Sequence, residues 1–392
     1  MTLRVLHLSF SSAGGAGSVA KILSNQQKLV GYDSELLSVI EENLRAAPLS
    51  SVVHTLAAGI DEYVVKNRNF PAPISLVRDH VSPSLAEKLE SADIVHLHGI
   101  NGALSLEELA RNWPNKKIIW TLHDMNPFTG TCHYSLGCQK FAAGCERCPA
   151  VKRAFQGMVT DSLSSKIRNV SALANLAVVA PSTWLAKQAS ASQVFHGHEI
   201  HVIANPADPS YFGAPQDSPP QIAAANYTAV VVAKNLVDPV KNVKAAVDAF
   251  LSTVGDSTSA QLLLVGEGGK AFESSRVHWL GQLSAKKLIP VLDSADVLIV
   301  SSLAENAPLV IAEAAARGVK SIVANVGGMP EMVELLGQGE VFDSPDQLSN
   351  ILSRDMIAPH NSRKKARASL EKNASKSFSP QAVAAKYAKV YT

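Results

Sequence analysis

Two glutamates eight positions apart, Glu305 and Glu313, are the residues whose type and spacing suggest chemistry most directly. They stand in the segment LAENAPLVIAEAAARGV, with Pro308 between them. Proline is tolerated in the first turn of a helix, where its missing N–H costs nothing, so we expect Glu305 in a loop and Glu313 inside a helix. The N–H groups of residues 309–311 would then form an anion site flanked by two acids.

Two lysines precede a second expected helix in the segment VAKNLVDPVKNVKAA. Lys234 and Lys241 follow an apolar run there, and two ammonium groups near a helix N-terminus suit a diphosphate. A solvated charged face is the alternative for each lysine. Further along, LLLVGEGG and VHWLGQLS bring Leu280 and Gly281 to a place where a planar base could lie against the backbone.

A glycine-rich turn, SSAGGAGSVAKIL, follows the first apolar run of the chain. Gly15 and Gly17 would let a phosphate or a sugar approach the backbone at the start of a helix. Residues 15–20 also fit the dinucleotide fingerprint, and Glu41 stands where an acid would bind a ribose. A nicotinamide-dependent oxidoreductase is therefore a rival interpretation, and a tight turn without a ligand is the structural alternative.

Histidines stand near the ends of two strand-like runs, DIVHLHGING and IIWTLHDMNPFTG. His98, and His123 with Asp124 beside it, are placed to bind hydroxyls or to orient a reacting group near neutral pH. A hydrogen-bonded structural role is the alternative for His96 and for His123.

All four cysteines fall in one 17-residue loop after these histidines: Cys132, Cys138, Cys145 and Cys148. The spacing C-x5-C-x6-C-x2-C could close a tetrahedral structural zinc site that stiffens the loop, with His133 as a spare ligand. Packed free thiols and disulfides are the alternatives, and disulfides are disfavoured in a cytosolic protein.

Length and composition limit the classes of protein to which this chain can belong. The chain has 392 residues, of which 46% are hydrophobic, and this is enough for two domains of ordinary size. The formal net charge of +2 gives no field that argues for nucleic acid. MTLRVLHLSF reads as a first strand rather than a signal peptide, and the other apolar runs are too short to span a bilayer. We expect a cytoplasmic protein, with peripheral contact to the inner face of a membrane as an option.

Short Val/Ile/Leu runs alternate with helical patterns twice along the chain, which is typical of parallel sheets with crossover helices. A Pro/Asp/Ser-rich stretch at residues 205–221 separates the two series and is typical of a linker. We therefore expect an α/β protein with two facing Rossmann-like domains that bind ligands at the carboxyl ends of their strands. The final stretch, SPQAVAAKYAKVYT, predicts a helix with Ser379 as its cap.

Taken together, these motifs resemble a GT-B retaining glycosyltransferase of glycosyltransferase family 4, and within it the polysaccharide-assembly enzymes of the colanic acid type. The resemblance covers nearly the whole length and is carried by GGAGSVAKILSNQQKLVGYDSELLS, VHLHGING, TLHDMNPFTGTCHYSLGCQKFAAGCERCP, APSTWLAKQ, VIANPAD, DPVKNV, LVGEG, SADVLIVSSLAENAPLVIAEAAARGV and ANVGGMPE. It implies an acceptor domain at residues 1–205, completed by a crossover helix at 379–392, and a donor domain at 206–378, with a cleft between them.

The resemblance also implies roles on the donor side. Glu313 would receive the ribose hydroxyls of a nucleotide-sugar, and Glu305 would face the transferred sugar. Lys241 matches the lysine of the family's diphosphate pair, whose usual arginine is absent here, and Lys234 is its nearest candidate. Other donor-binding positions are Gly15, Gly17, Gly281, Asn306, Ala307, Pro308 and Leu309. On the acceptor side, His123 matches the active-site histidine, and His98 and Asp124 lie beside it.

The implied activity is transfer of a hexose-type sugar, with retention of configuration, from a UDP- or GDP-sugar to a glycan, lipid-linked or small-molecule acceptor. No Asp-x-Asp motif is present, so catalysis requires no metal on this interpretation. Four basic residues after the cysteine loop would help docking to an anionic bilayer, with a solvated helix as the alternative: Lys152, Arg153, Lys166 and Arg168. The rival functions are an NAD(P)-dependent oxidoreductase and a catalytically silent nucleotide-sugar-binding protein.

Overall fold

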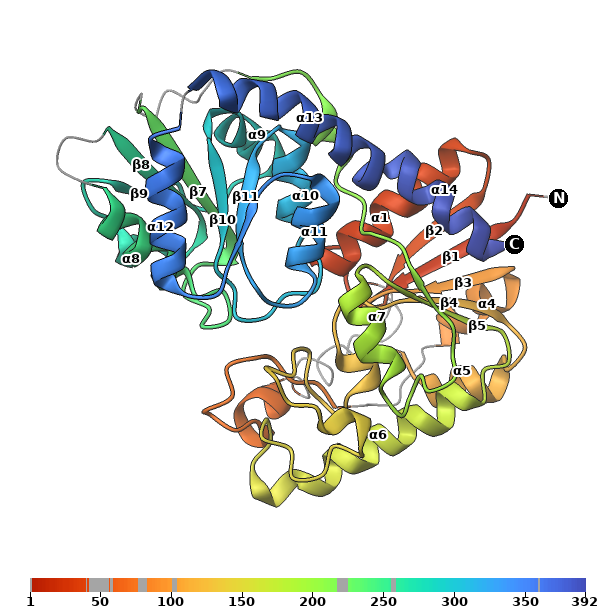
Figure 1. Cartoon of the computed structure of the whole chain (residues 1–392). Coiled ribbons are helices and arrows are strands. Elements are labelled where there is room, and N and C mark those ends of the chain that lie inside the picture. The colour runs from red at the N-terminus through yellow and green to blue at the C-terminus, as the bar shows by residue number, and fades with distance from the viewer. Residues whose placement is uncertain are drawn as a thin grey trace. The chain divides into compact units, whose positions relative to one another are not determined.

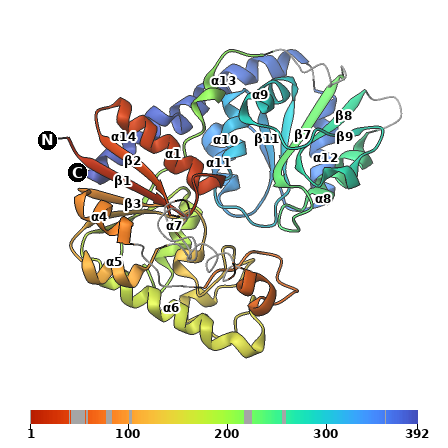
Figure 2. The same cartoon turned by 180° about the vertical axis from the view of Figure 1, so that it is seen from behind.

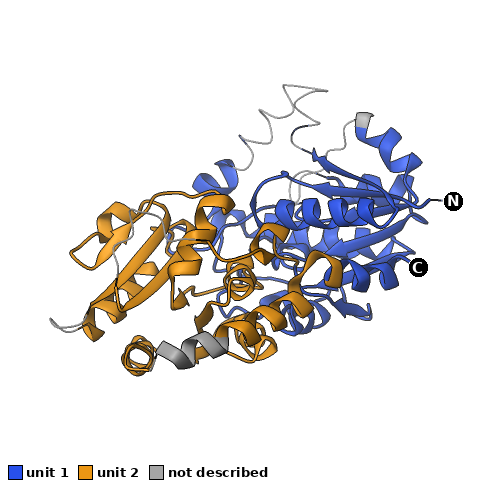
Figure 3. Cartoon of the chain, turned by 90° about the horizontal axis from the view of Figure 1, so that it is seen from above, with its two compact units in different colours: residues 1–205, 383–392 blue, residues 206–382 orange. Residues whose placement is uncertain are grey.

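The computed structural model describes residues 2–39, 41, 56, 59–76, 83–100, 104–216, 225–254, 259–358 and 360–392. The chain divides into two compact units (Figure 3). Unit 1 comprises Met1–Asn205 and Val383–Thr392, and unit 2 comprises Pro206–Ala382. Each unit is built around its own six-stranded sheet.

Unit 1 has a parallel sheet with the strand order β2-β1-β3-β4-β5-β6. Its strands are β1 (Arg4–Ser9), β2 (Asp33–Ser38), β3 (Ile94–Leu97), β4 (Lys117–Thr121), β5 (Leu176–Ala180) and β6 (Ile200–Val202). Its helices are α1 (Gly14–Leu29), α4 (Pro83–Ser91), α5 (Leu106–Asn112), α6 (Gln156–Ser171), α7 (Thr183–Ser190) and most of α14 (Pro380–Tyr391). Helices α5 and α6 pack against each other (Figure 2).

Unit 2 has a second parallel sheet, with the order β12-β11-β10-β7-β8-β9. Its strands are β7 (Tyr227–Asn235), β8 (Ala260–Glu267), β9 (Val277–Trp279), β10 (Val297–Val300), β11 (Lys320–Ala324) and β12 (Glu340–Phe342). Its helices are α8 (Val243–Thr253), α9 (Ala285–Ser294), α10 (Leu309–Ala316), α11 (Met329–Leu336), α12 (Pro345–Met356) and α13 (His360–Phe378). Helix α8 packs with α12, whereas α10 and α11 pack with α13 (Figure 1).

The expected α/β architecture with two Rossmann-like sheets is confirmed. Strands β3 and β10 are buried at every residue, because helices cover both faces of a parallel sheet. Such strands appear in a sequence as continuous apolar runs, and the Val/Ile/Leu runs of the two series coincide with strands among β1 to β11. Strand β12 was not expected, since its three residues form no such run.

The order of strands places the ligand-binding edge of each unit. In unit 2 the chain winds outward from β7 in one direction to β9 and in the other through β10 to β12, so the order reverses between β7 and β10. In unit 1 the corresponding reversal lies between β1 and β3. Ligands of open parallel sheets bind beyond the carboxyl ends of the strands at this switch point.

The stretch expected to be a linker is in large part a packed element of unit 2. A short 3₁₀ turn at Pro209–Phe212 buries Tyr211, and the carbonyl oxygens of Tyr211 and Gly213 accept hydrogen bonds from the Arg317 guanidinium at 3.0 and 2.7 Å. The same guanidinium forms a bidentate ion pair with Asp293 at 2.8 Å. The linker interpretation is therefore wrong for residues 206–216, and residues 217–221 lie outside the described part of the chain.

Candidate functional site

Lys241 and Glu305 meet at the carboxyl edge of the sheet in unit 2. Lys241 lies in the turn between β7 and α8, and Glu305 lies in the loop between β10 and α10. The Lys241 Nζ atom is 2.5 Å from Glu305 Oε1, and the Ser302 hydroxyl donates to the same oxygen at 3.1 Å. The Glu305 side chain is 9% exposed and the Lys241 side chain is 27% exposed. The pair thus stands at the switch point with its lysine open to a ligand.

The backbone fixes the loop that carries Glu305. The Leu303 N–H donates to the Val240 carbonyl at 2.7 Å, which joins the loop after β10 to the turn before α8. Gly327 has a φ of +62°, and a Cβ there would lie 1.5 Å from the Glu305 carbonyl oxygen. Gly327 therefore has to be glycine. Sequence reasoning gave it no role, because neither its positive φ nor this approach can be inferred from the motif GGMPE alone.

Helix α10 begins one residue later than expected. Pro308 has a φ of −66° and a ψ of 126°, so it precedes the first helical residue, Leu309, rather than lying inside the first turn. Glu305 is in the loop and Glu313 is in the helix, as expected. The Ile311 N–H donates to the Pro308 carbonyl at 3.2 Å. This bond tightens the first turn and reduces the expected three-amide anion site to the N–H groups of Leu309 and Val310.

The carboxyl group of Glu313 has a pKa above that of an ordinary glutamate. The side chain keeps some exposed surface, yet burial within unit 2 raises its pKa to about 7, and the negative charge of Asp208 adds to the effect. Burial also raises the pKa of Tyr211 on the neighbouring turn, with Glu313 as a second cause. Glu313 therefore changes its charge near neutral pH, and only its ionised form accepts hydrogen bonds from hydroxyls on both oxygens.

The remaining donor-side residues are spread over several loops of unit 2. Lys234 is exposed near the end of β7. Asn306 is buried beside Glu305, whereas Ala307 is half-buried. Gly281 follows β9 with a φ of +72°, and its missing Cβ faces open space. Of the two expected lysines, Lys241 is the one that directly contacts an expected acid.

Packing within unit 1 explains part of the glycine-rich turn before α1. A Cβ at Gly17 would lie 2.2 Å from the Ser11 carbonyl oxygen, so a close approach of helix α1 to its own loop requires glycine. Gly15 faces open space. Glu41, the acid of the formal dinucleotide fingerprint, accepts a hydrogen bond from the Ser12 hydroxyl at 2.9 Å. Gly17 thus has a packing role, and Glu41 binds the turn itself.

A chain of hydrogen-bonded histidines leads from His123 into the core of unit 1. His123 Nε2 is 3.0 Å from His98 Nδ1, and His98 Nε2 is 3.0 Å from His7 Nδ1. His7 Nε2 is 2.7 Å from the Gln27 side-chain oxygen. The Gln27 amide donates to Tyr391 of α14 at 2.7 Å. Sequence reasoning missed His7, because a histidine inside a strand carries no signal of its partners.

His96 extends the network beside this chain. The Tyr391 hydroxyl, which accepts from Gln27, lies 2.6 Å from His96 Nδ1. His96 Nε2 lies 2.8 Å from the Thr121 hydroxyl. His96 thus has the hydrogen-bonded structural role. Among the described residues, the ring nitrogens of His7, His96 and His98 lie within 4.8 Å of one another, and hydrogen bonds account for this clustering without a metal.

The network determines which nitrogen of His123 carries its proton. The Gln27 oxygen can only accept, so His7 Nε2 must donate and His7 Nδ1 must accept. His98 Nε2 then donates to His7, and His123 Nε2 in turn donates to His98. The Nδ1 atom of His123 is therefore the unprotonated acceptor nitrogen of the ring. Burial lowers the pKa of His123 to about 4, so the ring is neutral at pH 7 and does not act as a general acid.

The chain of hydrogen bonds from His123 through His98 to His7 predicts the same tautomer in these three rings. We expect long-range ¹H–¹⁵N correlation spectra at pH 7 to show His7, His98 and His123 protonated at Nε2, because one donor direction runs through the chain. Tyr391→Phe removes one of the contacts that orient the Gln27 amide and should lead to exchange between tautomers. Protonation at Nδ1 in the three rings of the unaltered protein would contradict the relay.

Asp124 and His133 form a second polar pair after β4. His133 Nδ1 lies 2.6 Å from Asp124 Oδ2, and His133 Nε2 lies 2.9 Å from the Ser75 hydroxyl. Burial opposes ionisation of Asp124, but His133 and the backbone N–H of Asn126 outweigh it and lower the pKa of this carboxyl. Both nitrogens of His133 are engaged, so the expectation that it is a spare metal ligand is wrong.

One of the four basic residues expected to help docking to a bilayer, Lys166, is not on the surface. Lys166 is 3% exposed and donates to the carbonyls of Asn126 and Thr129 at 2.6 and 2.8 Å. Burial lowers the pKa of this ammonium to about 8. Lys166 thus binds the loop after β4. The sequence of helix α6 is rich in polar residues and did not indicate that this lysine is buried. None of the described helices is long and apolar enough to cross a membrane.

The sequence of the chain matches a family model and one known protein. Residues 227–354, the core of unit 2, match the family model described as glycosyl transferases group 1. The protein WcaC of Escherichia coli (strain K12), named for glycosyl transfer in colanic acid biosynthesis, is 25% identical over 262 residues. The match covers 64% of this chain and 62% of that protein, so the chain spans less than two thirds of its relative.

Solved structures match over nearly the whole chain at low identity. A glycosyltransferase from Rickettsia africae ESF-5 has a TM-score of 0.63 and 16% identity, with 100% of this chain and 98% of that chain covered. Sucrose-phosphate synthase from Thermosynechococcus elongatus has a TM-score of 0.65 and 17% identity, with 99% and 98% covered. Anabaena Alr3699/HepE in complex with UDP-glucose has a TM-score of 0.60 and 16% identity, with 99% and 98% covered.

The two parallel sheets and these matches define the class: the chain has the GT-B fold of glycosyltransferases. The family match over residues 227–354 and the likeness to WcaC support the narrower resemblance to glycosyltransferases of the colanic acid type.

Proposed function

We propose that this chain is a retaining glycosyltransferase that moves a hexose-type sugar from a UDP- or GDP-sugar to a glycan, lipid-linked or small-molecule acceptor in the synthesis of a surface polysaccharide or glycoconjugate. Unit 2 binds the donor and unit 1 binds the acceptor. The observation that carries the proposal is the contact of Lys241 with Glu305 at the switch point of unit 2.

The chemistry of this contact suits a nucleotide-sugar. The Lys241 ammonium stabilises the diphosphate as it gains negative charge on leaving, and the N–H groups at the start of α10 add a favourable dipole. Glu305, held by Lys241 and Ser302, accepts hydrogen bonds from the sugar hydroxyls. Glu313 accepts those of the ribose. Neither glutamate is assigned as a covalent nucleophile, and no protein-bound metal is assigned to the transfer.

His123 supplies the matching group in unit 1. Its ring is neutral at pH 7, and the Asp124–His133 pair lies directly after it. The oxidoreductase alternative is not favoured, because the family match lies in unit 2 and Gly17 has a packing role of its own. The Anabaena structure holds UDP-glucose, which favours UDP as the first nucleotide to test.

We expect UDP to stabilise the protein against heat, and NAD and NADP not to do so. At a hundred times its dissociation constant a ligand adds about 2.7 kcal/mol to the free energy of unfolding. Glu313→Gln should weaken UDP binding about tenfold or more, because a hydrogen bond to a charged acceptor contributes roughly 1.5–3 kcal/mol. Glu334→Gln is the matched control, since this exposed acid of α11 lies in the same unit. Stabilisation by NAD alone would overturn the proposal.

The pH dependence of binding tests Glu313 separately. Because its pKa is about 7 and the ionised form is the better acceptor, UDP affinity should fall about tenfold between pH 8 and pH 6. The phosphate of UDP also titrates, so the comparison is with Glu313→Gln, in which only the phosphate contribution remains. Titration calorimetry at both pH values measures the difference. Equal pH dependence in the two proteins would contradict the role of Glu313.

A further inference from the structure

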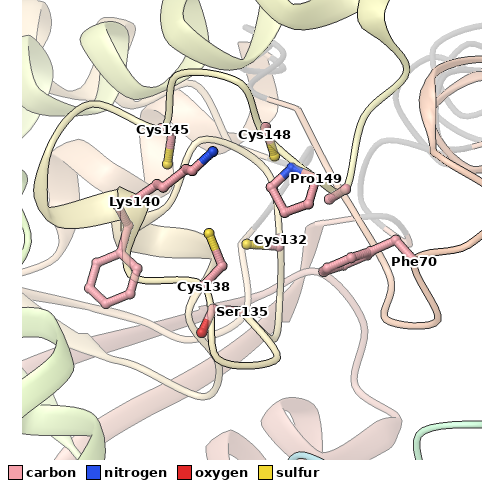
Figure 4. Close-up of a pocket in the computed structure, with 10 residues that line it drawn as sticks. Phe70, Cys132, Ser135, Cys138, Lys140, Cys145, Cys148 and Pro149 are labelled. Carbon is pink, nitrogen blue, oxygen red and sulfur yellow. The ribbon is translucent and has the colours of Figure 1, made fainter.

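The four cysteines of unit 1 line one small cavity in the loop between β4 and α6 (Figure 4). None is in a disulfide, and three are buried: Cys132, Cys145 and Cys148. Cys138 is half-buried. In Figure 4 the sulfur atoms of Cys132 and Cys138 point toward each other, and the other two point into the same space from the opposite segment. Residues spread over 17 positions of sequence thus share one enclosed site.

The cavity has room for an ion and not for an organic molecule. Its volume is about 10 Å³, roughly one water-sized sphere. Besides the thiols, its lining includes the rings of Phe70, Phe141 and Pro149. Apolar walls with several converging sulfur atoms are a poor environment for water, which requires polar partners. They suit a soft cation.

One backbone donor reaches a sulfur atom of the cluster. The Gly130 N–H donates to Cys145 Sγ at 3.3 Å. Donors of this kind orient metal-bound thiolates and share their charge. Neutral thiols accept such bonds weakly, so this contact fits a thiolate. The Thr129 hydroxyl donates to the Cys132 carbonyl at 2.7 Å and fixes the backbone at the first cysteine.

Burial and nearby charges act in opposite directions on the cysteine thiols. Burial raises the pKa of Cys132 to about 12 and also raises the pKa values of the Cys145 and Cys148 thiols, with neighbouring thiols adding to each shift. Lys140 and Lys166 have the opposite influence on Cys145 and offset part of the negative charge that a thiolate cluster would carry.

We propose that Cys132, Cys138, Cys145 and Cys148 bind one structural zinc ion. Four thiolates favour zinc, and the pair Cys145-x2-Cys148 has the spacing of tetrahedral zinc sites. Binding converts four thiols to thiolates, releases four protons and leaves the site with a net charge of −2. Among the described residues, no three of these sulfurs lie within 4.8 Å of one another, as the nitrogens of the histidine cluster do, so zinc binding requires rotation of the cysteine side chains toward the ion.

The ion links segments of a loop that contains little regular secondary structure. Between β4 and α6 the described residues form 3₁₀ turns at Asn126–Phe128, Lys140–Ala142 and Arg153–Phe155, and isolated bridges at Cys132 and Val151. Cys145 and Arg147 both have positive φ values, 56° and 51°. A metal that links Cys132 and Cys138 to Cys145 and Cys148 adds to the burial of Phe128 and Phe141 within this loop, and its first ligand is the neighbour of His133.

The test is the metal content of the full chain, purified without chelator under reducing conditions. Plasma mass spectrometry should find about one zinc per chain, and a thiol reagent should release it while modifying four thiols. Cys148→Ser should lower the zinc content severalfold. His133→Gln is the control, because this side chain lies in the same loop but pairs with Asp124, and it should keep its zinc.

Failure of a cysteine variant to fold leaves the proposal testable on the unaltered protein. Cobalt added after removal of zinc should give the intense visible bands of a tetrahedral thiolate site, and added zinc should displace it and raise the melting temperature. Metal-free protein with four free thiols, disulfides found under these conditions, or an iron–sulfur spectrum would each overturn the zinc site. Binding of UDP is measured separately, so failure here is distinguishable from failure of the proposed transferase function.

Discussion

Replacing Lys241 with methionine is expected to lower kcat for sugar transfer by about 10²–10³-fold, a prediction that depends on the proposed function. The lysine charge acts on the diphosphate mainly as it leaves, so the loss should appear in kcat more than in KM. Lys241→Arg keeps the charge but changes the geometry of its donors, and partial activity is expected from it. Steady-state kinetics with the donor found by thermal stabilisation measure all three proteins.

The matched control for this substitution is Lys244→Met. Lys244 lies three positions further along, in α8, and forms an exposed pair with Asp248 at 2.6 Å. Because exposed pairs contribute little, activity should be nearly unchanged. Combining Lys241→Met with Glu305→Gln should cost less than the sum of the two single losses, since the two side chains share one contact. Full kcat in Lys241→Met would remove the lysine from the transfer mechanism.

The sequence predicted the sheets and the pair of acids for a clear physical reason. Strands buried on both faces appear as apolar runs, and a proline before an apolar segment indicates the start of a helix. Both signals are local, so Glu305 and Glu313 could be assigned to a loop and a helix from the segment alone. The contact of Glu305 with Lys241, 64 positions away, was not predicted, because no local pattern links the two residues.

The histidine network shows that local sequence patterns cannot predict the long-range contacts of buried polar side chains. Tyr391 contacts Gln27 and His96, which precede it by 364 and 295 positions, and no periodicity links these residues. Lys166 misled for a similar reason, because its acceptors are backbone carbonyls, and these have no signature in the sequence. Buried polar groups depend on partners brought together by the fold, so their sequence context resembles that of exposed residues.

The same buried histidines should make unit 1 sensitive to acid. Burial lowers the pKa of His7 and of His123 to about 4, compared with about 6.5 for an unfolded histidine. Between these values the unfolded chain binds more protons, so the free energy of unfolding falls as pH falls. The loss is about 1.4 kcal/mol per pH unit for each histidine, or about 7 kcal/mol for both by pH 4 if they titrate independently. This is comparable to the whole stability of a domain.

Urea unfolding at pH 7.5, 6 and 5, followed by tryptophan fluorescence in a Trp279→Phe background that removes the tryptophan of unit 2, measures this dependence in unit 1, where Trp120 is fully buried. His7→Gln should reduce the slope by about 1.4 kcal/mol per pH unit, whereas His196→Gln, at an exposed position in the same unit, should leave it unchanged. Glu313 acts with the opposite sign in unit 2: its pKa is raised to about 7, so its unfavourable burial is relieved as pH falls toward 4.5. Unit 1 should therefore unfold first on acidification, and a slope in unit 1 that is the same with and without His7 would show that the histidines are already charged in the folded protein.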